Sequence, residues 1–123
     1  MGAVVYFGAS ALAVEEMPLP ALMRVTFSDL GAVRRASSGR AIVLTRRASV
    51  RTLYIEWKEM DAESAGNVLN LLEPGTLYVR YADPLTGAWR TAEFAVLLRE
   101  AELDKVTGGS ARLKKLKLKL EEV

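Results

Sequence analysis

Apolar and polar residues alternate along three stretches of the chain, at residues 22–28, 50–58 and 76–82. A period of two is typical of a β-strand that buries one face. The apolar faces of these expected strands are formed by Met23, Val25 and Phe27, by Leu53, Ile55 and Trp57, and by Leu77, Val79 and Tyr81. A fourth strand is expected at residues 89–98, where Phe94, Val96 and Leu98 alternate, and the turn sequence of residues 83–87 predicts a hairpin that joins it to 76–82.

Weaker signals predict the remaining extended segments. The β-forming residues 4–7, ended by Gly8, predict a short first strand, and residues 12–14 are expected to pair with it. Pro18 and Pro20 are expected to hold residues 17–21 extended without ladder hydrogen bonds. Ile42-Val43 favours a strand at residues 41–44, whereas residues 29–39 and 100–110, which contain glycine and many polar residues, are expected to be loops.

One segment has a helical pattern. Its apolar residues recur at helical spacing: Ala62, Ala65, Val68, Leu69 and Leu72. Asp61 is a good N-cap, and Glu63 in the first turn suits the helix dipole. Pro74-Gly75 ends the pattern. These residues are expected to pack against a sheet and to close one end of the core.

The pattern of the last segment fits two structures. A helix would align Leu113, Leu116, Leu120 and Val123 on one face. A strand would align Leu116, Leu118 and Leu120 on one face, with Lys117 and Lys119 on the other. We favour the strand. The chain of 123 residues is then one mainly-β (α+β) domain spanning residues 1–123, a β-sandwich or barrel of antiparallel strands flanked by one helix.

Composition excludes much of enzyme chemistry. The sequence has no His and no Cys, which removes imidazole bases, thiol nucleophiles and Cys/His zinc sites. The adjacent Glu121 and Glu122 would point to opposite faces of a strand and could not share one site. We therefore expect a protein that is not an enzyme, with no cofactor and no metal. No cation precedes the apolar residues 3–14, and that run is too short to span a membrane.

The basic residues fall into two groups, although the net charge is only +2. The first comprises Arg34, Arg35, Arg40, Arg46, Arg47 and Arg51, and the second comprises Arg112, Lys114, Lys115, Lys117 and Lys119. Three interpretations of the arginines stay open: a solvated loop, a subunit interface with carboxylates, or contacts to phosphate. Alternating lysines are typical of a solvent-facing side or of a protected edge strand.

The order of these features resembles the small minor tail or baseplate proteins of long-tailed bacteriophages. The resemblance follows nearly the whole chain. It consists of Pro18-Leu19-Pro20, the sequence at 25–30, an Arg- and Ser-containing loop ending at Gly39-Arg40, residues 51–57, Met60-Asp61-Ala62-Glu63, the turn sequence at 81–87, and residues 116–121. Each motif is weak alone, and the ordered set is more specific.

The resemblance implies a tail-tube-like fold and a structural role in the virion, in a phage tail assembled in the host cytoplasm. The chain would form a six-fold or three-fold ring with itself, contact other tail proteins, and meet DNA only as it passes through the channel, with no membrane contact. Segment 29–49 would reach a neighbouring subunit. The expected interface residues are Arg34, Arg35, Arg40, Arg46, Arg47, Glu100 and Glu102.

Two other classes of function are weighed against this one. The first alternative is a small β-barrel nucleic-acid-binding module that uses the Arg and Lys clusters. The second is a hydrolase-like enzyme, which the lack of His, Cys and converging carboxylates disfavours. Mass in solution separates a ring-forming protein from a small nucleic-acid binder.

Overall fold

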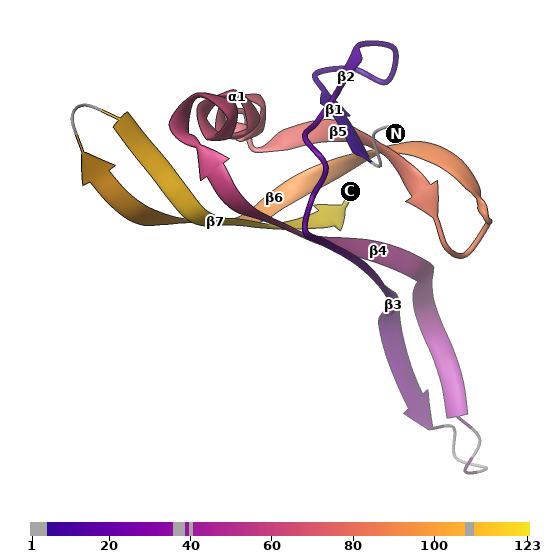
Figure 1. Ribbon diagram of the computed structural model, residues 1–123. Coiled ribbons are helices and arrows are strands. Elements are labelled where there is room, and N and C mark those ends of the chain that lie inside the picture. Colours follow the sequence, from indigo (N-terminus) through magenta and orange to yellow (C-terminus); the bar gives the residue numbers. More distant parts are fainter. Residues whose placement is uncertain (1–4, 36–38, 40, 108–109) are drawn as a thin grey trace.

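The computed structural model describes residues 5–35, 39, 41–107 and 110–123, and for residues 29–35, 41–48, 104–107 and 110–111 it describes the backbone alone. Seven strands and one helix follow one another in these described residues (Figure 1). The elements are β1 (Val5–Gly8), β2 (Val14–Glu16), β3 (Leu22–Arg35), β4 (Ala41–Asp61), α1 (Ala62–Leu72), β5 (Thr76–Asp83), β6 (Ala88–Thr107) and β7 (Ser110–Glu122).

All seven strands belong to one antiparallel sheet with the order β2-β1-β5-β6-β7-β4-β3. The sheet folds over at β6, whose first half pairs with β5 up to Ala95 and whose second half pairs with β7 from Phe94 onward. One layer therefore contains β2, β1, β5 and the start of β6, and the other contains the rest of β6 with β7, β4 and β3. The expected mainly-β architecture with one helix is confirmed, as an open two-layered sheet and not as a closed barrel.

The core lies between the two layers. The ring of Phe7 on β1 meets the ring of Trp57 on β4 edge to face, with centroids 6.3 Å apart. The Trp57 indole N–H donates a hydrogen bond of 2.8 Å to the carbonyl of Pro18, which satisfies the buried polar atom. The expected apolar faces of β4 and β5 are buried. In β3 the face is less covered, because Met23 and Val25 pack against the core while Phe27 stays 41% exposed.

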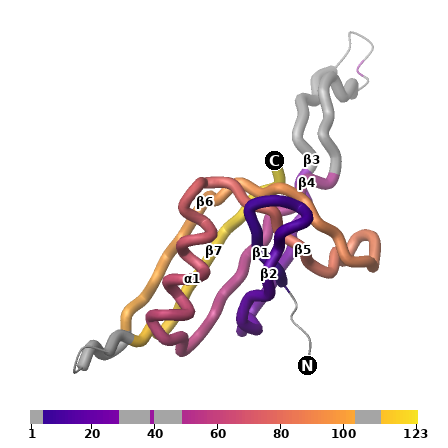
Figure 2. The backbone as a smooth tube through the Cα atoms, turned by 90° about the horizontal axis from the view of Figure 1, so that it is seen from above, coloured from indigo at the N-terminus to yellow at the C-terminus, as the bar shows by residue number. Residues whose placement is uncertain are grey.

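Helix α1 begins and ends where the sequence predicts. The backbone N–H of Ser64 donates to the Asp61 carboxylate at 3.1 Å, as an N-cap requires. The N–H of Gly75, at φ 88°, donates to the carbonyl of Leu72 and closes the last turn. Ala65, Val68 and Leu72 are buried, whereas Leu69 is only partly buried. Figure 2 shows α1 running across β4 and β7, which it contacts.

Leu72→Ala is expected to lower the free energy of unfolding by about 2–5 kcal/mol, because truncation of a fully buried leucine leaves a cavity. Leu69→Ala is the matched control on the same helix and is expected to cost less, because Leu69 is partly exposed. Urea unfolding followed by circular dichroism measures both. A Leu72→Ala midpoint equal to that of the wild type would show that α1 does not belong to the core.

The last segment is a strand, as predicted. In β7, Leu116, Leu118 and Leu120 are buried, and Lys117 is exposed on the other face. The expected alternation in β6 holds for Phe94 and Val96 but is wrong at Leu98, which is 45% exposed. The cause is a bulge, because Val96 lies opposite Leu120 while Leu98 lies opposite Lys119, so Leu97 is an extra residue.

The two expected loops are wrong, because both segments are largely strand. Strand β3 continues to Arg35, paired with β4 down to Ala41. Residues 29–35 of β3 pair only with β4, in a ribbon that extends beyond the other strands, so no second layer imposes an alternating sequence there. Strand β6 continues to Thr107. Register shifts on both sides of Leu103 interrupt its period of two. The Gly108-Gly109 pair between two extended runs is a hairpin signal that the loop interpretation passed over.

No helix in the described part of the chain is long and apolar enough to cross a membrane.

Candidate subunit interface

Four of the five expected interface arginines lie on one ribbon, which we call the arm and define as residues 30–35 of β3 with 41–47 of β4. In its register Arg34 lies opposite Ile42, and Arg46 lies opposite Gly31. Arg35 and Arg47 occupy its two ends, opposite Ala41 and Leu30. Arg40 lies outside the described residues. Figure 1 shows the arm leaving the two-layered body as an isolated ribbon.

The expected acidic partners lie elsewhere in the chain. Glu100 and Glu102 are exposed on the second half of β6, toward the β6–β7 hairpin. Glu102 makes an ion pair with Lys114 at 3.9 Å, and Glu100 lies opposite Lys117 in the register. The arm and the β6–β7 hairpin extend from opposite sides of the body (Figure 1). The backbone positions of the two sets of residues therefore lie on different sides of the body.

The base of the arm is a bulge that bends the ribbon out of the sheet. Ser28 lies opposite Val50 and Leu30 lies opposite Arg47, so two residues of β4 face one residue of β3. Ser49 adopts a left-handed conformation with φ 57°, which is uncommon for a residue other than glycine. Such bulges increase local twist and bend a strand.

A buried ion pair lies next to this bend. The Arg51 guanidinium donates two hydrogen bonds to Asp83, with Nε–Oδ1 and Nη2–Oδ2 distances of 3.0 and 2.7 Å. It donates a third to the carbonyl of Ser49 at 3.1 Å. Asp83 also accepts from the Thr86 hydroxyl at 3.2 Å. The hydrogen bonds from Arg51 hold the pKa of Asp83 below its usual range, although burial opposes them.

A second pair extends this cluster. Arg90 is ion-paired with Glu122 and also donates to the Tyr81 hydroxyl at 3.2 Å. Glu122 in turn lies 3.8 Å from Arg51. The side chains of Asp83 and Glu122 are 0% and 9% exposed. Together the four charged residues link the middle of β4 to the end of β5, the start of β6 and the end of β7, next to the point where the arm leaves the sheet.

The alternation of residues in the sequence could have predicted this cluster. Arg51 is instead grouped with the other arginines because of its charge. Arg51 stands two residues before Leu53 and four before Ile55, so the alternation of β4 places it on the same, core-facing side. In the same way Asp83 stands two residues after the core-facing Tyr81, and Glu122 stands two residues after the core-facing Leu120. A charged residue at the end of a core-facing series must find an opposite charge, because an unpaired buried charge is very costly.

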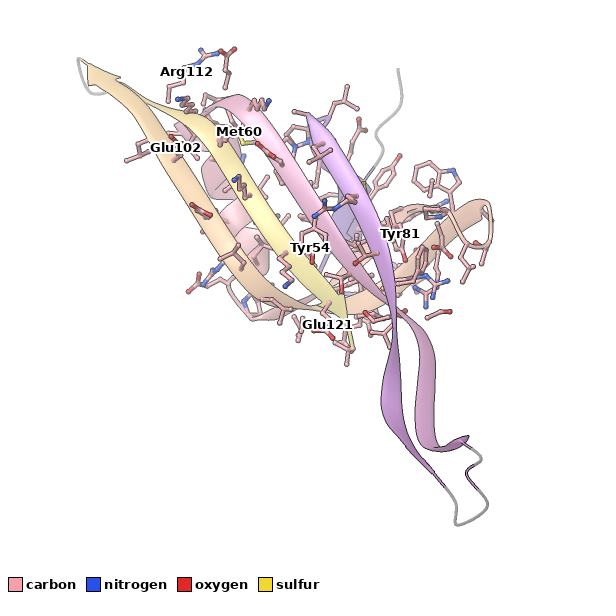
Figure 3. All side chains as sticks on the ribbon, turned by 90° about the horizontal axis from the view of Figure 1, so that it is seen from below. Tyr54, Met60, Tyr81, Glu102, Arg112 and Glu121 are labelled. Carbon is pink, nitrogen blue, oxygen red and sulfur yellow. The ribbon has the colours of Figure 1, made fainter. Side chains whose placement is uncertain are left out.

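The layer of β6, β7, β4 and β3 has two free edges. On their outer sides, β3 and the part of β6 after Leu98 have no ladder partner in the described part of this chain. One face of the layer is covered by α1 and by the other layer. The opposite face, which we call the open face, is uncovered (Figure 3), and it carries Leu22, Arg24, Tyr54, Glu56, Leu98, Lys117 and Lys119.

The described residues contain no group of three or more His, Cys, Asp or Glu side chains placed to hold a metal ion. The charged cluster of Arg51 and Asp83 is paired internally and is nearly closed to solvent. Its geometry suits a structural role.

No protein-family model matches the sequence, and the search of curated proteins gives no match. Solved structures do match. A chain in the tail of an empty gene transfer agent particle with C6 symmetry has a TM-score of 0.63, is 12% identical, and aligns over 98% of this chain and 90% of that chain. A chain in the virion of a native gene transfer agent particle has a TM-score of 0.59 at 12% identity, over 98% and 91% of the two chains. At this identity the likeness concerns the fold.

Proposed function

We propose that this chain is a structural, non-enzymatic protein of a phage-type tail, which forms a ring around the tail channel and contacts other tail proteins. The observation that carries the proposal is the four-stranded layer with two free edges, in a fold like that of a chain in a C6-symmetric tail. Its location would be the tail of a virion, as tail tube, distal tail or baseplate component, assembled in the host cytoplasm.

The two free edges are complementary to each other. Neighbouring strands in the order β6, β7, β4, β3 are antiparallel, so β6 of one copy placed beside β3 of the next would also run antiparallel. Long unpaired edges invite pairing with another chain, and closure into a barrel removes them. This contact is heterologous, because it joins two different edges, and repeated rotation closes it into a ring.

A six-membered ring would enclose a wide channel. Six copies with four strands each would make a barrel of about 24 strands, wider than the barrels of 22 strands that enclose a plug domain. The open face would line the channel, because α1 and the second layer cover the other face. The helix would then lie on the outside of the ring.

In a ring of staggered copies the expected interface residues would come together. Glu100 and Glu102 lie on the free edge of β6, and the arm continues the free edge strand β3. In the shared register Glu100 lies in the row of Leu22, about eight residues along β3 from the start of the arm at Leu30 (30 − 22), so pairing of these edges would place carboxylates of one copy near arginines of the next when neighbouring copies are staggered by that amount. Arginine is well suited to such contacts, because its planar fork binds carboxylates through two hydrogen bonds. Because the sheet is open, the closed barrel of the nucleic-acid-binding alternative does not describe a single copy of this chain.

The test reverses the charge of the arm. Arg46→Glu/Arg47→Glu is expected to abolish ring assembly while circular dichroism remains that of the wild type. Mass photometry and negative-stain microscopy at increasing protein concentration measure assembly. Arg80→Glu/Arg99→Glu is the matched control, because it changes the charge equally on β5 and on the helix-facing side of β6, where Arg99 pairs with Glu73.

A second variant tests the pairing itself. Adding Glu100→Arg/Glu102→Arg to the reversed arm is expected to restore assembly, because the interface charges are then exchanged. The proposed assembly would be refuted if Arg46→Glu/Arg47→Glu alone formed rings of wild-type size. It would also be refuted if the wild-type chain stayed monomeric at every concentration.

A further inference from the structure

We propose that the open face binds the phosphate backbone of duplex DNA, through a row of side chains formed by Arg24, Tyr54 and Lys119. The inference deepens the proposed function, because the same face would line the channel of the ring. It rests on the register of three strands, on the charge of one shallow pocket, and on the kinds of side chain that line it.

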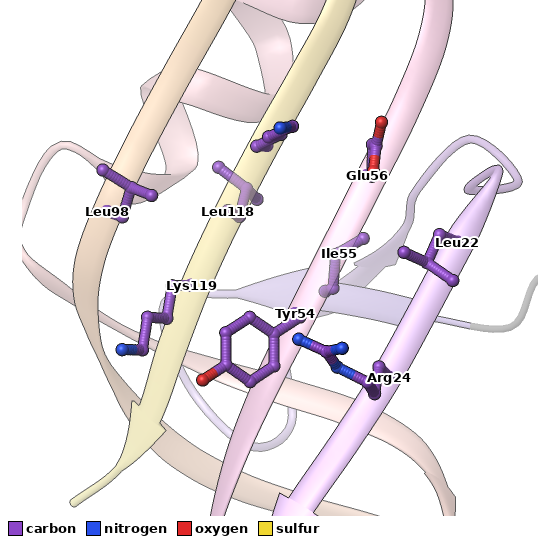
Figure 4. A pocket seen from close by; sticks show the side chains of 9 residues that line it. Leu22, Arg24, Tyr54, Ile55, Glu56, Leu98, Leu118 and Lys119 are labelled. Carbon is purple, nitrogen blue, oxygen red and sulfur yellow. The ribbon is translucent and has the colours of Figure 1, made fainter.

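The row crosses three adjacent strands. Arg24 of β3 lies opposite Tyr54 of β4, and Tyr54 lies opposite Lys119 of β7. The Arg24 guanidinium lies 4.5 Å from the centre of the Tyr54 ring, and the Lys119 ammonium lies 5.6 Å from it on the other side. Figure 4 shows the three side chains together over the strands. The tyrosine ring thus holds two cations at fixed positions on one surface.

The row borders a pocket of about 210 Å³ whose charge is positive. Its cations are Arg24, Lys117 and Lys119, and its single carboxylate, Glu56, is already paired with Lys115 at 3.4 Å. Within the described residues, no ion pair neutralises the three cations. Glu100 lies opposite Lys117 in the register, and the structure shows no ion pair between them.

The lining residues suit a backbone contact and not the recognition of bases. Phosphate contacts are made by Arg, Lys and Tyr side chains, whereas bases are read largely by Asn, Gln and Arg inside a groove. No Asn or Gln lines the pocket. Binding should therefore be independent of sequence and weakened by salt. Repetition around a ring would multiply a weak contact through valency, while each single contact could still exchange as DNA moves.

The experiment measures binding of the full chain to a fluorescent duplex of about 30 base pairs by anisotropy at several salt concentrations. Arg24→Gln/Lys119→Gln is expected to weaken binding about tenfold or more at low salt and to reduce the salt slope by about two. Arg112→Gln/Lys114→Gln is the control with the same charge change, at exposed positions outside the pocket. Equal losses from both variants, or binding insensitive to salt, would overturn the inference.

Two further readouts separate this inference from the proposed ring. A polyglutamate peptide that displaces the duplex at equal charge would overturn DNA as the occupant and assign the face to an acidic protein segment. Mass photometry on the same samples reports assembly. Rings that do not bind DNA would overturn the inference alone, whereas DNA binding that depends on Arg24 and Lys119 in a chain that never assembles would support the inference and refute the ring.

Discussion

Leu118→Lys is expected to prevent the chain from folding at neutral pH. Leu118 is 2% exposed and lies between Ile55 and Arg99 in the register, on the face that packs against the core. The substitution removes about 1.5–3 kcal/mol of apolar burial and adds an unpaired charge, whose burial costs several kcal/mol more. A domain of this size is stable by only about 5–15 kcal/mol. Far-ultraviolet circular dichroism and urea titration measure the loss.

Lys117→Leu is the control for this prediction. Lys117 is the preceding residue of the same strand and points to the open face, where it is exposed. A surface substitution of this kind should change stability by no more than about 0.5 kcal/mol. If both variants unfold at the same urea concentration, the two faces of β7 are assigned wrongly.

Asp83→Asn is expected to lower the free energy of unfolding by about 3–5 kcal/mol at neutral pH, because the buried Arg51 loses its closest carboxylate and keeps only Glu122, 3.8 Å away. The neutral amide keeps the shape of the side chain, so the loss reports charge and hydrogen bonding and not volume. Glu73→Gln is the control, because it breaks an exposed ion pair with Arg99 that contributes about 0–1 kcal/mol. Equal urea midpoints for the two variants would contradict a structural role for the cluster.

The same ion pair predicts how stability depends on pH. The pKa of Asp83 is lowered in the folded protein, mainly by hydrogen bonds from Arg51, so the folded state binds this proton less readily than the unfolded chain. The stabilisation is fully present above the unfolded value of 3.8 and is lost as the pH falls through the lowered folded value. The free energies of unfolding of the wild type and of Asp83→Asn should therefore become equal at low pH, and acid titration of both measures this.

Local patterns predicted most of the body of the fold. The N-cap Asp61, the turn before Gly87 and the alternation around Ile55 depend on neighbours in the sequence, and each lies as expected. The long hairpins could not be found in the same way, because ladder hydrogen bonds form between backbones whatever the side chains. Alternation appears only where one face is buried and no bulge intervenes.

The candidate interface could be predicted only in part, for the same physical reason. Its arginines could be named from composition, but their place on an arm that leaves the body depends on the bulge at Ser49, for which the sequence has no glycine as a marker. The buried cluster joins Arg51 to Asp83, 32 positions apart in the chain. The alternation along each strand predicts that both residues are buried, whereas only the folded sheet shows that they pair with each other.

The position of β7 in the sheet has a consequence for how the chain folds as it is synthesised. Strand β7 follows the other six described strands in the chain, yet it lies between β6 and β4. Domains generally fold as units as they leave the ribosome, from the N-terminal end. Here β4 and β6 cannot join into one layer until residues 110–122 have been made. In the ring that we propose, growing chains would therefore not pair their edges before β7 has been translated.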